Sequence, residues 1–192
     1  RDTGEWITKN AGVKRVGLEL GGKNAIIVMD DANLKLALDG AVWGAFGTTG
    51  QRCTAVSRVI VHKSIKERFI RELCVRANRL KVGNGLKRTT DMGPLVNRAA
   101  LEKCERYTNI GIKEGAKLVC GGKRLDGKGY FFKPTIFEDV VIDMRIAQEE
   151  IFGPVLSVIE FSTLDEAIDI MNSVEYGLSS SIYTKNINNA MQ

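Results

Sequence analysis

Cys53 is the residue of this sequence with the most distinctive chemistry. It lies in the polar segment GQRCT at 50–54, between a run of small residues and an apolar stretch. A loop of this kind can expose a thiol, and the guanidinium of Arg52 would favour the thiolate, which is the nucleophilic form. A lone cysteine can also be a small packing residue without chemistry, so both interpretations stay open on this segment alone.

Glu19 is a second candidate, because it is a carboxylate flanked by apolar residues. It stands between Leu18 and Leu20, directly before Gly21-Gly22, a pair that lets the backbone approach another group closely. A carboxylate partly removed from water in this position would suit general base catalysis. The alternative is a glutamate on an edge strand that points into water.

The segment EEIFGP at 149–154 is a third candidate. An acidic pair followed by an aromatic residue and a Gly-Pro turn predicts a rigid loop before a strand. Glu150 could accept hydrogen bonds from ribose hydroxyls, and Phe152 could stack on a flat ring. Taken alone, the segment is equally compatible with an acidic surface turn that carries a core phenylalanine.

The remaining cysteines argue against a metal site or a disulfide framework. Cys74 and Cys104 fall within helical patterns and Cys120 ends a strand pattern, as expected of packing residues. The four cysteines form no CxxC pair and the chain has one histidine, so the ligand spacing of a structural zinc site is missing. With so few cysteines and no secretory signal, we expect reduced thiols in a cytoplasmic protein.

The net charge of +5 does not indicate a nucleic-acid partner. Basic residues alternate with acidic ones, as in Lys66-Glu67-Arg68, which is typical of solvated helix faces rather than of a basic patch. The sequence has no apolar run of about 18 residues, so no membrane-spanning helix is expected. A composition of 44% hydrophobic and 27% charged residues indicates a globular domain with a sizeable core.

Alternating helix and strand patterns must position the candidate residues. Short apolar runs bounded by turn residues predict strands at 24–29, 55–61, 117–120, 131–137, 154–161 and 179–183. Apolar residues spaced by three and four predict helices at 34–46, 64–80, 98–115 and 163–173, after the end of another helix at 3–12. Asp30-Asp31 is expected to start the helix at 34–46. The alternation predicts an α/β fold with a mostly parallel open sheet covered by helices.

Three of these segments together resemble the aldehyde dehydrogenase superfamily. LELGGK at 18–23 is similar to the family's glutamate signature, GTTGQRCT at 47–54 to its cysteine signature, and EEIFGP at 149–154 to its nicotinamide-ribose loop. The motifs occur in the family's order with similar spacing, and the likeness covers essentially all 192 residues. The resemblance implies the catalytic-domain fold of that family and NAD(P)-dependent oxidation of an aldehyde.

The resemblance also implies a role for each candidate residue. Cys53 would attack the aldehyde to give a thiohemiacetal, with its backbone N–H stabilising the oxyanion. Hydride transfer to NAD or NADP would leave a thioester, which water activated by Glu19 would hydrolyse. Glu150 would hold the nicotinamide ribose, and Phe152 would contact the nicotinamide ring.

The resemblance further implies that this chain is part of a longer protein. Residues 1–20 would be the C-terminal remnant of the cofactor-binding domain, with Gly4 as the surviving glycine of a Gly-Ser-x-x-x-Gly phosphate turn. Residues 21–192 would form the catalytic domain without its last segments. We expect the full-length enzyme to be a homo-oligomer that acts on a small-molecule aldehyde, with neither nucleic acid nor membrane as a partner. The isolated fragment is expected to be inactive.

Three alternatives remain at this point. An acylating relative would pass the thioester to coenzyme A, but such members often lack the base, so Glu19 favours water as the acceptor. A Cys-His hydrolase would need a histidine beside Cys53, whereas His62 would lie about 25–30 Å away along an extended strand. A non-catalytic interaction domain that uses the basic surface is the third alternative.

Overall fold

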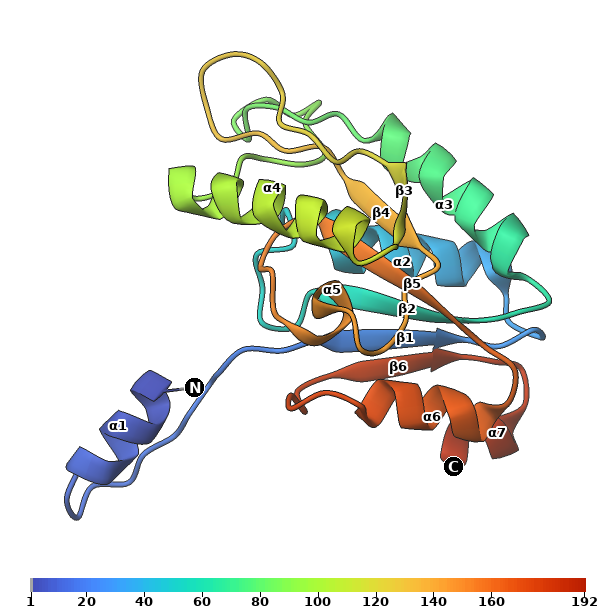
Figure 1. Cartoon of the computed structure of the whole chain (residues 1–192), viewed down its shortest axis with the longest axis horizontal. Helices are drawn as coiled ribbons and strands as arrows, with labels where there is room; N and C mark the ends of the chain where they lie inside the picture. Colours follow the sequence, from blue (N-terminus) through green and yellow to red (C-terminus); the bar gives the residue numbers. More distant parts are fainter. Residues whose placement is uncertain (1) are drawn as a thin grey trace.

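A computed structural model describes residues 2–192 of the chain, so Arg1 lies outside the described residues. The chain forms a six-stranded sheet with helices on both faces (Figure 1). Across the sheet the strands follow the order β3-β4-β5-β2-β1-β6. Their bounds are β1 Asn24–Val28, β2 Val56–His62, β3 Lys117–Cys120, β4 Thr135–Glu138, β5 Val155–Phe161 and β6 Ser180–Tyr183.

The sheet is parallel except at one edge. β1 pairs in parallel with β2 and β6, and β5 pairs in parallel with β2 and β4. β3 joins the edge antiparallel to β4. All five residues of β1 are buried, because helices cover both faces and leave neither to solvent. The mostly parallel, helix-covered sheet predicted from the sequence is therefore confirmed.

Two groups of helices enclose two hydrophobic layers. α2 and α3 cover one face, where Leu38 and Phe69 pack on side chains from β1, β2 and β5. α4, α5 and α6 cover the other face, where Tyr107 and Ile146 lie in the second layer.

No helix in residues 2–192 is both long and apolar enough to cross a bilayer. The helices are α1 Asp2–Asn10, α2 Leu34–Phe46, α3 Lys66–Arg79, α4 Arg98–Lys113, α5 Arg145–Gln148, α6 Leu164–Asn172 and α7 Ile187–Met191.

The amino ends of the parallel strands bring the three motif segments together. β1 begins directly after Lys23, β2 after the polar segment 48–55, and β5 after Pro154. Because parallel strands place their amino ends at one edge of a sheet, these segments meet at the left edge of the sheet in Figure 1. The helices that follow the same strands, α2, α3 and α6, begin at the opposite edge.

α1 stands apart from the sheet and is joined to it by an extended segment (Figure 1). The apolar stretch 16–20 in that segment forms no strand. It lies instead along the helix, since a side chain placed on the buried Gly4 would meet Leu18 and Leu20. The helix expected at 3–12 is confirmed, and its last turn ends at Asn10.

The start of α2 differs from the expectation. The side chain of Asn33, rather than Asp30-Asp31, caps the helix by accepting a hydrogen bond from the Leu36 N–H at 3.2 Å. Asp31 instead accepts hydrogen bonds from the Thr184 hydroxyl and the Lys185 N–H, at 2.9 and 3.0 Å. The acidic pair was therefore the wrong cap, because a contact 153 residues away holds Asp31.

The strand expected at 131–137 is shorter in the structure. β4 begins at Thr135, while Phe132 forms an isolated antiparallel bridge with Arg124. Pro134 lacks the N–H that a continuous ladder would use, so the segment divides there. The short helices α5 and α7 were not expected, because four or five residues are too few to show a helical period.

Candidate active site

The Cys53 loop is held in place by polar contacts with the segment that precedes α4. The Thr49 hydroxyl donates to the Gly93 carbonyl at 3.1 Å. The Gln51 amide donates to the Pro94 carbonyl at 3.3 Å and accepts from the Val96 N–H at 2.9 Å. The loop is thus fixed at its outer side, and Cys53 is half-buried within it.

Asn24 fixes the inner side of the same loop. This residue is only 4% exposed, and its side-chain N–H groups donate to the carbonyls of Cys53 and Ala55 at 2.6 and 3.0 Å. Its side-chain oxygen accepts from the Ser179 N–H at 3.0 Å. One buried amide therefore ties the Cys53 loop to the starts of β1 and β6, and its donors and acceptor all have hydrogen-bond partners, as burial requires.

Gly21-Gly22 is the point where the other two motifs converge. The Gly22 N–H donates to a carboxylate oxygen of Glu150 at 3.0 Å. A methyl group on Gly22 would overlap the Cys53 carbonyl oxygen, and one on Gly21 would overlap the Glu150 carboxylate. The absence of side chains at both positions lets the Cys53 loop and the Glu150 loop approach β1 together.

Glu19 and Glu150 line one pocket beside this junction. Its volume is about 340 Å³, and Tyr176 and Leu178, from the segment before β6, also line it. Glu19 is exposed, and Glu150 is half-buried. Residues of two motifs far apart in sequence thus line one pocket, next to the glycine pair that packs closely on the Cys53 carbonyl.

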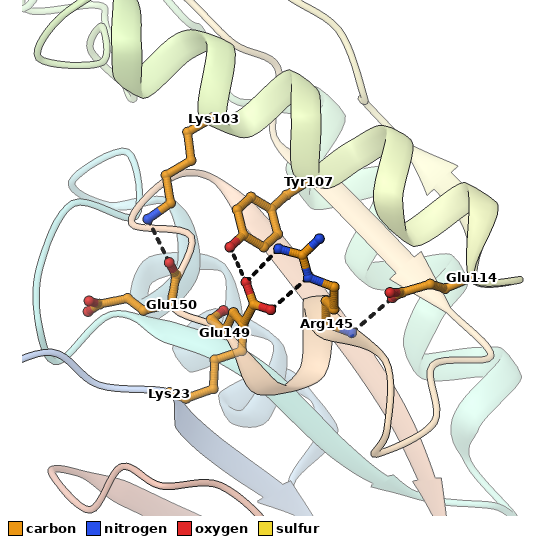
Figure 2. Close-up of polar contacts among 7 residues, drawn as sticks. All are labelled: Lys23, Lys103, Tyr107, Glu114, Arg145, Glu149 and Glu150. Carbon is orange, nitrogen blue, oxygen red and sulfur yellow. Dashed lines mark hydrogen bonds and ion pairs between the residues drawn. The ribbon is translucent and has the colours of Figure 1, made fainter.

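The loop that carries Glu150 is fastened from two sides (Figure 2). The ammonium groups of Lys23 and Lys103 donate to the carbonyls of Glu149 and Glu150, each at 2.7 Å. Arg145 forms two hydrogen bonds with the Glu149 carboxylate, at 2.7 and 3.0 Å, and the Tyr107 hydroxyl donates to it as well. Chiefly through the bond with Arg145, the pKa of Glu149 falls to about 2.

Burial dominates the electrostatics at the start of β1. Lys23 is 2% exposed, and desolvation, followed by the nearby charge of Arg58, lowers its pKa to about 7. Burial lowers the pKa of Arg58 to about 10. The Arg58 guanidinium donates to the carbonyls of Lys23, Ile170 and Met171 at 2.8–3.0 Å. These bonds join β2 to the residue before β1 and to the end of α6.

Comparison with known proteins identifies this arrangement. The family model described as the aldehyde dehydrogenase family matches residues 1–192. The chain belongs to the aldehyde dehydrogenase family. A betaine aldehyde dehydrogenase of Brucella anthropi is 50% identical over 96% of this chain, and an alpha-ketoglutaric semialdehyde dehydrogenase of Bacillus subtilis is 48% identical over 88%.

Solved structures of family members superpose closely on the fold. Betaine aldehyde dehydrogenase from Staphylococcus aureus, solved in complex with NAD+, gives a TM-score of 0.95 at 42% identity over 99% of this chain. Lactaldehyde dehydrogenase from Escherichia coli gives 0.95 at 45% identity over 99%. The chain spans 36–40% of the length of these four relatives.

The structure brings parts of the three motif segments close to one another. Cys53, Glu150 and the glycine pair lie at one edge of the sheet, held by the contacts above. The expected partial desolvation of Glu19 is wrong for this chain, because its side chain is exposed on an extended segment that no strand pairs. Gly4 lies apart from the junction, in the first turn of α1.

The side chain of Arg52 stacks on an aromatic ring of α2 and, in the described part of the chain, forms no hydrogen bond with the thiol of its neighbour Cys53. Its guanidinium carbon lies 4.3 Å from the centroid of the exposed Trp43 ring on α2, a cation–π geometry. Among the described residues, no hydrogen bond joins it to Cys53, and its buried Nε has no partner. Arg52 therefore packs the loop against α2.

The other cysteines and the histidine occupy the places that the sequence predicted. Burial raises the pKa of the Cys104 thiol to about 12. A hydrogen bond with Cys120 and burial raise the pKa of Cys74. His62 ends β2, the strand that Cys53 precedes, and bonds with Ser64 and Ser162. Within residues 2–192, no cluster of His, Cys, Asp and Glu could hold a metal ion.

Sequence reasoning missed the residues that fasten the site. In the sequence, Lys23 ends a motif, Asn24 begins a predicted strand, and Arg58 is one position of another predicted strand. None of these patterns indicates a role in holding the site. The one available signal was the presence of Lys, Asn and Arg in segments predicted to be buried, since buried charges are kept only with partners. Naming those partners required the fold.

Proposed function

We propose that the intact protein oxidises an aldehyde to a carboxylic acid with NAD or NADP, and that residues 21–192 form its catalytic domain. The observation that carries this proposal is the double contact of Gly21-Gly22. The pair touches the carbonyl of Cys53 and binds the carboxylate of Glu150. A nucleophile loop and a ribose-binding loop at one junction are the arrangement that aldehyde oxidation requires.

Cys53 supplies the nucleophile in this proposal. Its sulfur adds to the aldehyde carbon, and the carbonyl oxygen becomes an oxyanion. Within the described residues the Cys53 N–H has no hydrogen-bond partner, so it can donate to that oxygen. The Asn24 amide, which holds the Cys53 carbonyl, keeps this peptide unit in a fixed orientation.

The residues around the glycine pair fit a nicotinamide ribose. Glu150 lines the pocket and carries an acceptor carboxylate, and the Phe152 ring, two residues further along the same loop, is 41% exposed. Glu150 would hold the ribose hydroxyls and Phe152 would contact the nicotinamide ring. The bound dinucleotide supplies a hydride acceptor, so that the carbon attached to Cys53 is oxidised to a thioester.

Glu19 completes the reaction by activating water. Its carboxylate lines the same pocket as Glu150, in an exposed position that water reaches. Glu19 takes one proton while the water oxygen bonds to the thioester carbon. The carbon–sulfur bond then breaks, the proton held by Glu19 passes to the sulfur, and the acid and the Cys53 thiol are released. Water rather than coenzyme A is the acceptor on this account.

The remaining assignments concern the whole protein. Residues 1–20 would belong to the cofactor-binding domain, with Gly4 beside a phosphate of the dinucleotide. The enzyme would be a cytoplasmic homo-oligomer. Its substrate is an aldehyde, and the names of its relatives point to betaine aldehyde, a semialdehyde or lactaldehyde as the first compounds to assay.

A pair of cysteine variants tests the proposal. Formation of NADH or NADPH is measured in the intact protein with these three aldehydes, before and after Cys53→Ala. We expect one or more aldehydes to support turnover and Cys53→Ala to abolish it. Cys74→Ala, which changes a half-buried thiol on α3 away from the motif segments, is the matched control and should retain activity. Full activity in Cys53→Ala would refute the assignment.

A further inference from the structure

Lys23 is an unusual group to find buried at this site. Its side chain is 2% exposed, and its ammonium donates to the Glu149 carbonyl at 2.7 Å. Removing an ammonium from water costs several kcal/mol unless bonds and charges compensate it. The charges of Glu150 and Glu149 raise the pKa of Lys23, but those of Arg58 and Lys103 lower it. This lysine is therefore retained at a cost to stability, which suggests a role beyond packing.

The adjacent Glu149 and Glu150 have different surroundings. The Glu149 carboxylate is bound by Arg145 of α5 and by Tyr107 of α4, and Lys23 binds the carbonyl of the same residue (Figure 2). Glu149 is thus fastened through both its side chain and its backbone. The Glu150 carboxylate accepts from the Gly22 N–H and faces the pocket.

The loop needs such fastening because its next residues are strained. Phe152 has a φ of 59°, the left-handed region that costs a side-chain-bearing residue roughly 1–2 kcal/mol. A strained backbone persists only where its surroundings determine it from several directions. Lys23 directly before β1, Arg145 from α5, and Lys103 with Tyr107 from α4 supply those directions.

We propose that Lys23 is a positioning residue for the dinucleotide: its ammonium, together with the Arg145–Glu149–Tyr107 cluster, holds the loop so that Glu150 and Phe152 meet the ribose and the ring. This inference rests on the proposed function, since it assumes that this loop receives the nicotinamide half. Lys23 touches neither substrate nor dinucleotide on this account. It acts through the backbone of Glu149.

Two variants of the intact protein test the inference. Lys23→Met removes the buried donor, and Arg145→Gln weakens the hold on Glu149 from an exposed position where folding is not at risk. Lys87→Met, in an exposed loop, is the matched control. The dissociation constant of NAD+ or NADP+ is measured by titration calorimetry, and amide hydrogen exchange is followed at residues 150–153.

We expect Lys23→Met and Arg145→Gln each to weaken dinucleotide binding about tenfold, the effect of one lost hydrogen bond. Exchange at 150–153 should accelerate, while the rate at which iodoacetamide alkylates Cys53 stays unchanged. Wild-type affinity and exchange in a folded Lys23→Met protein would overturn the inference. If Lys23→Met does not fold, unchanged binding and exchange in Arg145→Gln would overturn it equally.

The same measurements separate this inference from the proposed function. If the wild-type protein binds neither dinucleotide, the proposed function fails, and the positioning role that depends on it fails too. If the wild type binds dinucleotide and oxidises aldehydes while both variants bind it equally well, only the positioning role is rejected. Loss of aldehyde oxidation with intact binding and exchange also counts against it.

Discussion

Replacing the buried Lys23 by methionine should change how stability depends on pH. Burial lowers the pKa of this lysine from 10.5 to about 7 in the folded protein. Between these values the unfolded chain binds a proton that the folded chain does not, so the free energy of unfolding rises with pH across this window. Below pH 7 both states are protonated and the charged ammonium destabilises the fold. Methionine removes this dependence.

The size of the effect follows from the same two values. The difference between 10.5 and about 7 corresponds to roughly 5 kcal/mol over the whole window. Between pH 7 and pH 9, the accessible part, the wild-type protein should gain about 2 kcal/mol relative to Lys23→Met. Lys23 is fully buried, so solvent screening does not reduce this figure appreciably.

Urea unfolding at pH 7, 8 and 9 measures the difference. Wild type, Lys23→Met and the exposed-lysine control Lys87→Met are compared at each pH, so that titration of cysteines and other groups cancels between them. The control should follow the wild type. If the wild type and Lys23→Met change in parallel from pH 7 to pH 9, the charge on Lys23 is not suppressed by burial and the reasoning is wrong.

Three further outcomes are expected. Iodoacetamide should label Cys53 before the other thiols, because Cys104 and Cys120 are buried and the pKa of Cys74 is raised; mass mapping that finds Cys74 modified first would contradict this. Glu19→Gln should spare the first burst of reduced dinucleotide and slow steady turnover, because hydrolysis follows hydride transfer; rapid-mixing kinetics showing a lost burst and normal hydrolysis would reverse the assignment. Gly22→Ala should destabilise the protein by about 1–3 kcal/mol, since the new methyl group meets the Cys53 carbonyl. Gly85→Ala, where the added methyl group meets open space, should have little effect, and equal urea midpoints for the two variants would refute the steric argument.

Local sequence patterns predicted those helices and strands whose own apolar residues determine where they begin and end. The helix at 34–46 and the strand at 117–120 have the bounds that their apolar patterns indicated. The cap of α2 was misassigned because Thr184 and Lys185, from the far end of the chain, bind Asp31. A sequence pattern carries no record of such a partner.

The residues of the candidate site also fall into those that a local pattern predicts and those that depend on distant contacts. The motifs predict Cys53 and Glu150 as site residues, whereas no motif pointed to the groups that hold their loops. Lys23 meets the Glu149 carbonyl across 126 residues, and this contact depends on the order of strands in the sheet. The exposure of Glu19 could not be predicted either, because the stretch 16–20 has the composition of a strand and no neighbour to pair with.

The location of Cys53 and Glu150 at the amino edge of the sheet has a consequence for which part of a dinucleotide this domain could contact. Phosphates are commonly held by the positive ends of helices that directly follow parallel strands. Here α2, α3 and α6 begin at the far edge, some distance from Cys53 and Glu150. Under the proposed function, the starts of these helices would lie too far away to hold a pyrophosphate. The edge with Cys53 and Glu150 would then contact only the nicotinamide half of the dinucleotide, and the phosphates would need donors from outside this sheet.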